Sequence, residues 1–240
     1  AQQKMSQNFT ITPGIEQRLA SWNEHLRKQK QEAAGLRPCI TLSREFGCQA
    51  YPVAEALQNL FNRKKLFGGN WMVLDRKLLE TIAKQSGFSE TDIQHAERQN
   101  PVLHSMFSLF HDSESAEPHK VFRFIRRAVR HFAQNGNSII VGRGGAVLTQ
   151  DLENCLHVRL FASLEFRLAY CCETFGLEKE AADEYLQSQQ RLRDEFLGHY
   201  TSQDPSSQEF YHLTLNNARW TPEQLALLIK QALQQTFGAD

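Results

Sequence analysis

Cys39-Ile-Thr-Leu-Ser-Arg-Glu-Phe-Gly47-Cys-Gln-Ala-Tyr-Pro-Val-Ala-Glu-Ala-Leu57 is the most informative segment of the chain. In it a short apolar run meets a polar turn, and the turn leads into an amphipathic helix. The backbone N–H groups of such a turn converge at a helix N-terminus, where unsatisfied donors and the helix dipole favour an anion. We therefore expect a phosphate-binding loop in which the amides of residues 46–51 face one concavity.

The residues of this loop depart from those of an ordinary phosphate loop, which uses glycines to expose its amides and a lysine to reach the phosphates. Here only Gly47 remains, and Ala50 stands where the lysine is expected. Gln49 and Ala50 carry a Cβ, which disfavours positive φ values by about 1 kcal/mol or more per residue. Tyr51 can stack on a base or pack in the core, and we favour packing. The sequence therefore predicts a divergent nucleotide site.

Five segments resemble, in the right order, motifs of the cytidylate kinase-like family. They are Ser43-Arg-Glu-Phe-Gly47 after an apolar run, Trp71 to Leu79, Ile139 to Gly144, Leu156 to Arg167, and Tyr211 to Asn217. Together they span roughly residues 38 to 233, which is most of the chain. The resemblance implies a P-loop nucleoside monophosphate kinase fold, ATP as phosphate donor, magnesium (Mg2+), and a nucleotide acceptor.

The same resemblance implies roles for individual residues. The donor phosphates would be held by Ser43, Arg44, Glu45, Phe46, Gly47, Cys48, Gln49, Ala50 and Tyr51. The acceptor would be bound by Asp75, Arg143 and Gly144, and Arg167 and Arg193 would belong to a lid. The residues with a catalytic role would be Arg44, Arg143, Arg167 and Arg193. The lid departs from the family at Gln190, where the family has Asp.

Residue chemistry supports two of these arginines. Arg143 lies between glycines that let the backbone approach a ligand, and a guanidinium can hold a phosphate with two parallel bonds. For Arg44 two interpretations stay open: it supplies charge that the missing lysine would have given, or it pairs with Glu45. Magnesium needs one or two carboxylates besides phosphates, and Glu45 and Asp75 are both candidates. The histidine spacings predict no metal site of their own.

Composition excludes several classes of protein. The chain has 27 basic and 27 acidic residues, so no global charge favours nucleic acid or a membrane as a partner. Its five cysteines lack paired Cys-x-x-Cys spacing, and we expect Cys171 and Cys172 to pack as small apolar residues. Neither a membrane span nor a signal peptide is predicted. We expect a cytoplasmic protein with reduced thiols.

Strand-like and helical segments alternate along the chain, which indicates βαβ units and a mostly parallel sheet. Together with the family resemblance, which implies the P-loop NTPase type, the expected fold is an α/β, three-layer fold with about five strands and helices on both faces. We predict strands at 39–42, 71–74, 138–141, 156–161 and 211–215, and helices at 53–65, 76–85, 121–132, 166–175 and 178–200 and from Thr221 onward. Between them, residues 88–118 read as helical fragments followed by an exposed loop.

Two domains are expected: an N-terminal extension with one helix over residues 1–37, and a kinase-like domain over 38–240. The acceptor-binding insert would cover about 71–120 and the lid about 163–204. The helix of the extension has a narrow apolar stripe, which favours packing on the core over a homodimer contact.

Two functions remain open. The first is a nucleotide kinase-like phosphotransferase that moves the γ-phosphate of ATP to a nucleoside monophosphate resembling CMP, or to another small acceptor. The second is a catalytically impaired nucleotide-sensing or partner-binding protein with the same fold, which the divergent loop favours.

Overall fold

A computed structural model describes residues 37–75, 78–79, 118–142, 144–201, 204 and 206–238. They lie in the second of two compact units, Gly35–Asp240. The first unit, Ala1–Ala34, lies outside the described residues, and with it the predicted N-terminal helix and its dimer contact. Most of the helix predicted over 76–85 and the elements predicted over 88–117 lie outside them as well.

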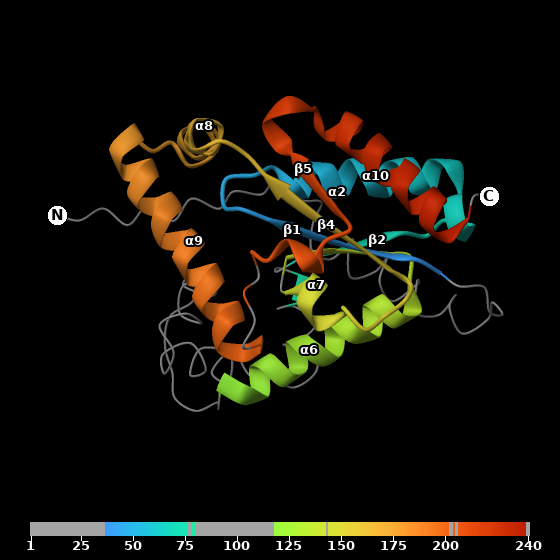
Figure 1. The fold of residues 1–240 in the computed structure, drawn as a ribbon. Helices are drawn as coiled ribbons and strands as arrows, with labels where there is room; N and C mark the ends of the chain where they lie inside the picture. The colour runs from blue at the N-terminus through green and yellow to red at the C-terminus, as the bar shows by residue number, and fades with distance from the viewer. Residues whose placement is uncertain are drawn as a thin grey trace. The chain divides into compact units, whose positions relative to one another are not determined.

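The strands of the described residues form one parallel sheet in the order β2-β3-β1-β4-β5 (Figure 1). They are β1 (Cys39–Arg44), β2 (Met72–Leu74), β3 (Ser138–Val141), β4 (Cys155–Phe161) and β5 (Leu213–Asn216). In the central strand, Leu42 lies opposite Val141 of β3 and Val158 of β4. Because every neighbouring pair is parallel, all five carboxyl ends lie at one edge of the sheet. The predicted mostly parallel sheet of about five strands is confirmed.

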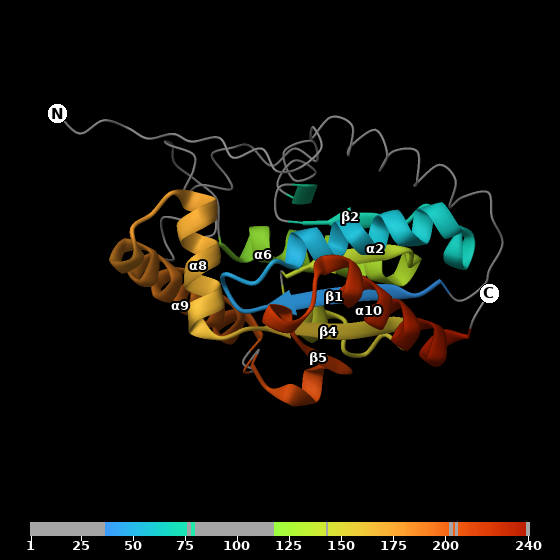
Figure 2. The same cartoon turned by 90° about the horizontal axis from the view of Figure 1, so that it is seen from above.

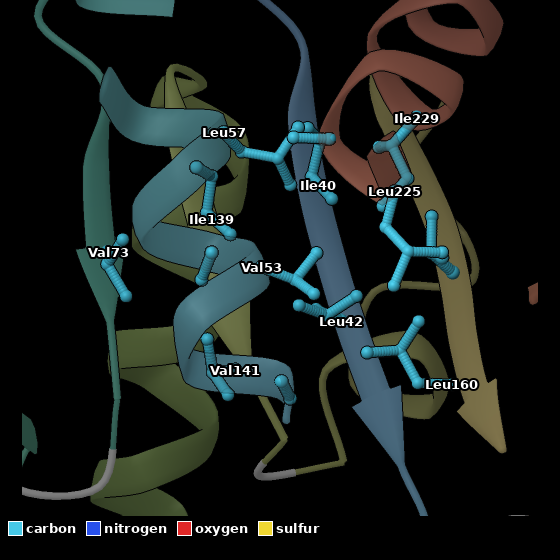
Figure 3. Close-up of a cluster of buried hydrophobic side chains, with 14 of the residues drawn as sticks. Ile40, Leu42, Val53, Leu57, Val73, Ile139, Val141, Leu160, Leu225 and Ile229 are labelled. Carbon is cyan, nitrogen blue, oxygen red and sulfur yellow. The ribbon is translucent and has the colours of Figure 1, made fainter. Parts of the chain in front are cut away.

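Helices cover both faces of this sheet, which confirms the three-layer prediction (Figures 1 and 2). One face carries α2 (Ala50–Lys64) and α10 (Pro222–Phe237), and the other carries α6 (Pro118–Asn135) and α7 (Gly145–Leu148). In the core, Val53 and Leu57 of α2 pack with Ile40 of β1, and Ile229 of α10 joins the same cluster (Figure 3). All of these side chains are fully buried, so the apolar runs in the sequence correspond to the interior.

Two further helices, α8 (Leu164–Phe175) and α9 (Lys179–Thr201), follow β4 and are termed the lid helices below. Short 3-10 turns complete the described chain: η1 (Leu66–Gly68), η2 (Gln208–Phe210) and η3 (Asn217–Arg219). The last helix begins as predicted. Thr221 accepts a hydrogen bond from the Gln224 amide in a capping box, and Pro222 occupies the first turn.

The cysteines behave as expected. All five are free thiols, and Cys171 is fully buried with Ala182 and Leu186 in a small cluster between the lid helices. In the part of the chain that the structure describes, no helix is both long and apolar enough to cross a bilayer.

Candidate phosphate-binding site

The loop between β1 and α2 lies where the sequence predicts it, at the carboxyl edge of the sheet. It leaves β1 after Arg44, and α2 begins at Ala50. The amide of Glu45 continues the sheet by donating to the carbonyl of Leu160 on β4, at 3.1 Å. On the other neighbouring strand, the turn after β3 reaches Gly144, which has a φ of 66° at the start of α7. Arg143 in this turn lies outside the described residues.

The loop amides differ from the expected open concavity, because side chains of the protein already take two of them. The Phe46 N–H donates to Oε1 of Gln190 on α9 at 2.8 Å. The Gln49 N–H donates to Oδ1 of Asn217 on η3 at 2.6 Å. Two more amides bond within the turn, Cys48 to the Glu45 carbonyl and Ala50 to the Cys48 carbonyl. Carboxamide oxygens thus occupy places where phosphate oxygens were expected.

Backbone torsion explains part of this difference. Gly47 has a φ of 87° and is the loop residue in the left-handed region, whereas Gln49 has a φ of −80°. A nest of successive amides needs alternating torsions, which the Cβ atoms after Gly47 disfavour. In addition, Pro52 has no N–H to offer in the first turn of α2. The loop therefore presents fewer donors than an ordinary phosphate loop.

Gly47 also lets the loop approach the lid. A Cβ on this residue would lie 2.7 Å from the Cβ of Arg167 and 2.9 Å from the Arg167 carbonyl oxygen on α8. Real Cβ atoms do not come this close to other atoms, so a side chain here would push the loop away from α8. The glycine is required by close packing as well as by its torsion.

Phe46 joins the loop to both lid helices through its ring. The ring stacks on Phe175 of α8 at 6.4 Å between centroids and meets Tyr185 of α9 edge-on at 5.5 Å. The guanidinium of Arg193 lies over the same ring, 4.7 Å from its centroid. Aromatic and cation–π contacts of this kind each stabilise by about 0.5–1.5 kcal/mol beyond area burial. The lid helices are therefore docked on the loop.

Gln190 links this docking to a carboxylate. While its Oε1 accepts from Phe46, its Nε2 donates to both oxygens of Asp194, at 3.0 and 3.1 Å. Burial raises the pKa of the Asp194 carboxyl, and the bond from Gln190 opposes that rise. Both ends of the Gln190 amide are thus engaged, which holds Oε1 at the loop.

Asn217 was not predicted as a site residue, and its side chain is unusual. It is 2% exposed, its Oδ1 accepts from the Gln49 amide, and its Nδ2 has no hydrogen-bond partner among the described residues. A buried donor without an acceptor costs about 1–3 kcal/mol. Its place after the carboxyl end of β5 was the available sequence signal, since ligands in such sheets bind beyond this edge.

Three predicted arginines approach the loop from different elements. Arg167 pairs with Oε2 of Glu45 at 3.4 Å and donates to the Phe46 carbonyl at 3.4 Å. Arg44, Arg167 and Arg193 all act electrostatically on the Cys48 thiol. Burial and the charge of Glu45 outweigh the three cations and raise the pKa of Cys48 to about 12, so the thiol stays protonated at neutral pH.

The remaining predicted residues take structural positions. Ser43 continues β1 opposite Arg159 of β4. Tyr51 packs against the main core cluster, as expected. Asp75 follows β2, and its Oδ1 accepts from the Leu78 amide at 2.9 Å. Arg44 pairs with neither Glu45 nor another described carboxylate within ion-pair distance; its guanidinium lies against Gly142.

The two candidate magnesium ligands, Glu45 and Asp75, each have an oxygen that already interacts with another group of the protein. Oε2 of Glu45 already accepts from the Ala162 amide and faces Arg167, and Asp75 begins a helical turn. Within the described ranges no group of three or more His, Cys, Asp or Glu side chains can hold a metal ion. Because magnesium commonly binds one or two carboxylates together with substrate phosphates, it would enter this site with a nucleotide.

A cavity of about 720 Å³ lies away from the loop, near the start of β5. Its lining includes His157 and His212, whose rings stack 5.1 Å apart. Nδ1 of His157 lies 2.8 Å from the Thr41 hydroxyl. Burial, and next the charge of His212, lower the pKa of His157 to about 4, so this ring is neutral at physiological pH.

The fold defines an α/β protein with a parallel sheet covered by helices on both faces and a polar loop between β1 and α2 at the carboxyl edge of the sheet. The model of the "Cytidylate kinase-like family" matches residues 39–219, and the chain belongs to this family. Membership of this family supports a nucleotide kinase-like function. The predicted resemblance is confirmed.

A solved structure supports the fold, and two further similarities are reported with it. An uncharacterized protein from Eubacterium ventriosum has a TM-score of 0.58 at 16% identity, with 82% of this chain and 99% of that chain covered. Shikimate kinase from Bacteroides thetaiotaomicron has a TM-score of 0.45 at 14% identity, covering 82% and 98% of the two chains. A segment of 105 residues is 27% identical to uronate isomerase from Corynebacterium glutamicum. That match covers 44% of this chain and spans 20% of the isomerase.

Proposed function

We propose that the protein is an ATP-dependent phosphotransferase that moves the γ-phosphate to a nucleoside monophosphate resembling CMP, or to another small acceptor. The observation that carries this proposal is the position of Arg167 and Arg193. They come from separate lid helices and meet the loop at Phe46, where Arg167 bonds the carbonyl and Arg193 covers the ring. Phosphoryl transfer depends on positioning and on neutralising negative charge, and two guanidinium groups at the loop supply such charge.

The donor phosphates would bind where carboxamide oxygens now lie. Gln190 and Asn217 bond the loop through side chains, which would have to turn away for a phosphate to bind, whereas the bonds of Cys48 and Ala50 are formed inside the turn. An amide that donates to a carboxamide oxygen can donate to a phosphate oxygen with similar geometry. Phe46 and Gln49 are therefore the amides that we assign to the donor, together with Gly47 between them.

Magnesium, when bound with ATP, would neutralise part of the charge of the phosphates. Glu45 and Asp75 are the described carboxylates at this edge of the sheet that would hold it or its water. The acceptor would lie on the side of Asp75, Arg143 and Gly144, which the family resemblance assigns to it. The lid arginines would then face the transferring phosphoryl group from the opposite side.

The test is ADP release by the purified full chain with ATP, magnesium and CMP, followed by a coupled assay. We expect ADP formation that depends on the acceptor, and a higher melting temperature with nucleotide, because a ligand that binds the native state stabilises it. If no nucleotide raises the melting temperature, the kinase proposal is wrong.

A second candidate has a specific observation in its favour. Because the loop lacks the lysine and two of its amides are bonded to Gln190 and Asn217, the chain also fits a catalytically impaired nucleotide-sensing or partner-binding protein. The same assay separates the two candidates. A rise in melting temperature without ADP formation, across nucleoside monophosphates as acceptors, would favour the second.

A further inference from the structure

The side chain of Arg44 turns away from the donor side of the loop. Arg44 ends β1, and its guanidinium lies against Gly142 at the end of the neighbouring strand β3. A Cβ on Gly142 would collide with Nη1 of Arg44, so the missing side chain at Gly142 is what makes room for the guanidinium. The amide of Gly142 bonds the Leu42 carbonyl at 3.0 Å, which fixes this backbone relative to β1.

The other loop contacts point in the opposite direction. Glu45 reaches β4 and α8 through Leu160, Ala162 and Arg167. Gln49 reaches η3 after β5 through Asn217. The sheet order places β4 and β5 on one side of β1, and β3 and β2 on the other. The loop therefore divides the sheet edge, with Arg167 and Arg193 on one side and Arg44 on the other.

The surroundings of Arg44 suit an anion. The partly buried guanidinium donates no hydrogen bond to any described residue. Burial lowers the pKa of Arg44, and the charge of Asp75, which follows β2, opposes that shift. A desolvated cation is costly unless it is paired and hydrogen-bonded, and a guanidinium presents two parallel N–H groups that match two oxygens of a phosphate.

We propose that Arg44, seated in the space left by Gly142, binds the phosphate of the acceptor nucleotide and not the phosphates of ATP. This inference rests on the proposed function, and it assigns to Arg44 the binding of the acceptor's phosphate monoester. It also leaves Arg167 and Arg193 as the described cations on the donor side, because Arg44 does not replace the missing lysine there.

Calorimetric titration of the full chain with CMP, cytidine and a non-hydrolysable ATP analogue tests this assignment. In Arg44→Met we expect affinity for CMP to fall about ten- to a hundredfold, as for a charged hydrogen-bonded pair. Affinity for cytidine and for the ATP analogue should stay unchanged. Arg191→Met, which removes an exposed guanidinium that pairs with Glu195 on α9, is the matched control and should change neither.

Arg44→Lys keeps the positive charge but loses the two parallel N–H groups of the guanidinium, so we expect it to fold and to lose less affinity for CMP than Arg44→Met, with no loss of affinity for the ATP analogue. This variant provides the test if Arg44→Met does not fold. If the Arg44 variants lose affinity for the ATP analogue but keep their affinity for CMP, the assignment is wrong. It is also wrong if they lose affinity for both ligands equally. If the wild-type chain binds both nucleotides and the Arg44 variants do too, the assignment fails while the proposed function stands. If the wild type binds neither nucleotide, both fail.

Discussion

Phe46 and Gln190 are joined by a hydrogen bond of 2.8 Å from a loop amide to a side-chain oxygen, across 144 residues of sequence. The bond fastens α9 to the loop at an amide that a phosphate would use. If the donor phosphates bind as proposed, phosphate binding and the docking of α9 compete for this one N–H, which the following substitutions can test.

Gln190→Ala removes the competing oxygen. We expect affinity for tripolyphosphate to rise several-fold and the melting temperature of the ligand-free protein to fall, because the Phe46 N–H then lacks a partner until an anion binds. Gln187→Ala is the matched control: Gln187 is an exposed glutamine of α9 that bonds Asp183 at 3.0 Å. It should leave both measurements unchanged. Equal affinities in the two variants would show that Gln190 does not compete.

Asn217→Ala should lower the free energy of unfolding by about 1 kcal/mol: it leaves the partly buried Gln49 N–H without an acceptor, and removing the unpartnered Nδ2 offsets part of that loss. Urea titration measures this. Asn216→Ala serves as the control. The Asn216 side chain accepts from the Ala218 amide at 3.0 Å in an exposed bond, and losing this bond should lower the free energy of unfolding by less. A smaller effect at Asn217 than at Asn216 would contradict the role of Asn217 in holding the loop.

Arg193→Met should lower the rate of phosphoryl transfer by about a thousandfold, in the range known for arginines that neutralise the transferring group. Arg191→Met should leave that rate unchanged, because the side chain of Arg191 is 71% exposed. Initial rates at saturating ATP and acceptor decide the matter. Equal rates in both variants would remove Arg193 from the catalytic residues.

Gly47→Ala tests close packing against α8. Gly47 and Gly68 both have positive φ values, 87° and 83°. Atoms of Arg167 crowd the Cβ position at Gly47, whereas no atom lies within 4 Å of that position at Gly68. Both substitutions should cost about 1–2 kcal/mol for torsion, and Gly47→Ala about 1–3 kcal/mol more for overpacking. Chemical denaturation gives both values, and equal costs would mean that the loop adjusts freely.

His157 makes stability depend on pH. Its folded-state pKa of about 4 lies below the ordinary 6.5, so the unfolded chain takes up the proton first as pH falls. This contribution is complete above about pH 6.5 and is lost as pH falls toward 4, which amounts to about 3 kcal/mol.

Urea unfolding at pH 4.5 and pH 7.5 measures that slope, which should be smaller in His157→Leu. His131→Leu, at an exposed position of α6, should keep it. An unchanged slope in His157→Leu would assign the pH dependence to other groups.

The fold could be predicted because its signals are local. The buried run Ser138–Val141 and the capped start at Thr221 each specify an element within a few residues. The position of the loop follows from β1 and α2 in the same way. These patterns depend on burial and backbone propensity, which neighbouring residues determine.

The site could be predicted only in part, because its decisive contacts are distant in sequence. Gln49 meets Asn217 across 168 residues, and nothing near either residue specifies that bond. Gln190 carried one signal, as the residue that departs from the family's Asp, but its bond to Phe46 depends on how α9 docks. The direction of Arg44 likewise depends on the space at Gly142, which only the assembled sheet reveals.

A crystal structure of the full chain with a non-hydrolysable ATP analogue and magnesium would show whether the donor phosphates bind the loop amides. We expect phosphate oxygens to replace Oε1 of Gln190 at the Phe46 N–H and Oδ1 of Asn217 at the Gln49 N–H. Nucleotide bound elsewhere, with both carboxamide bonds intact, would contradict this expectation.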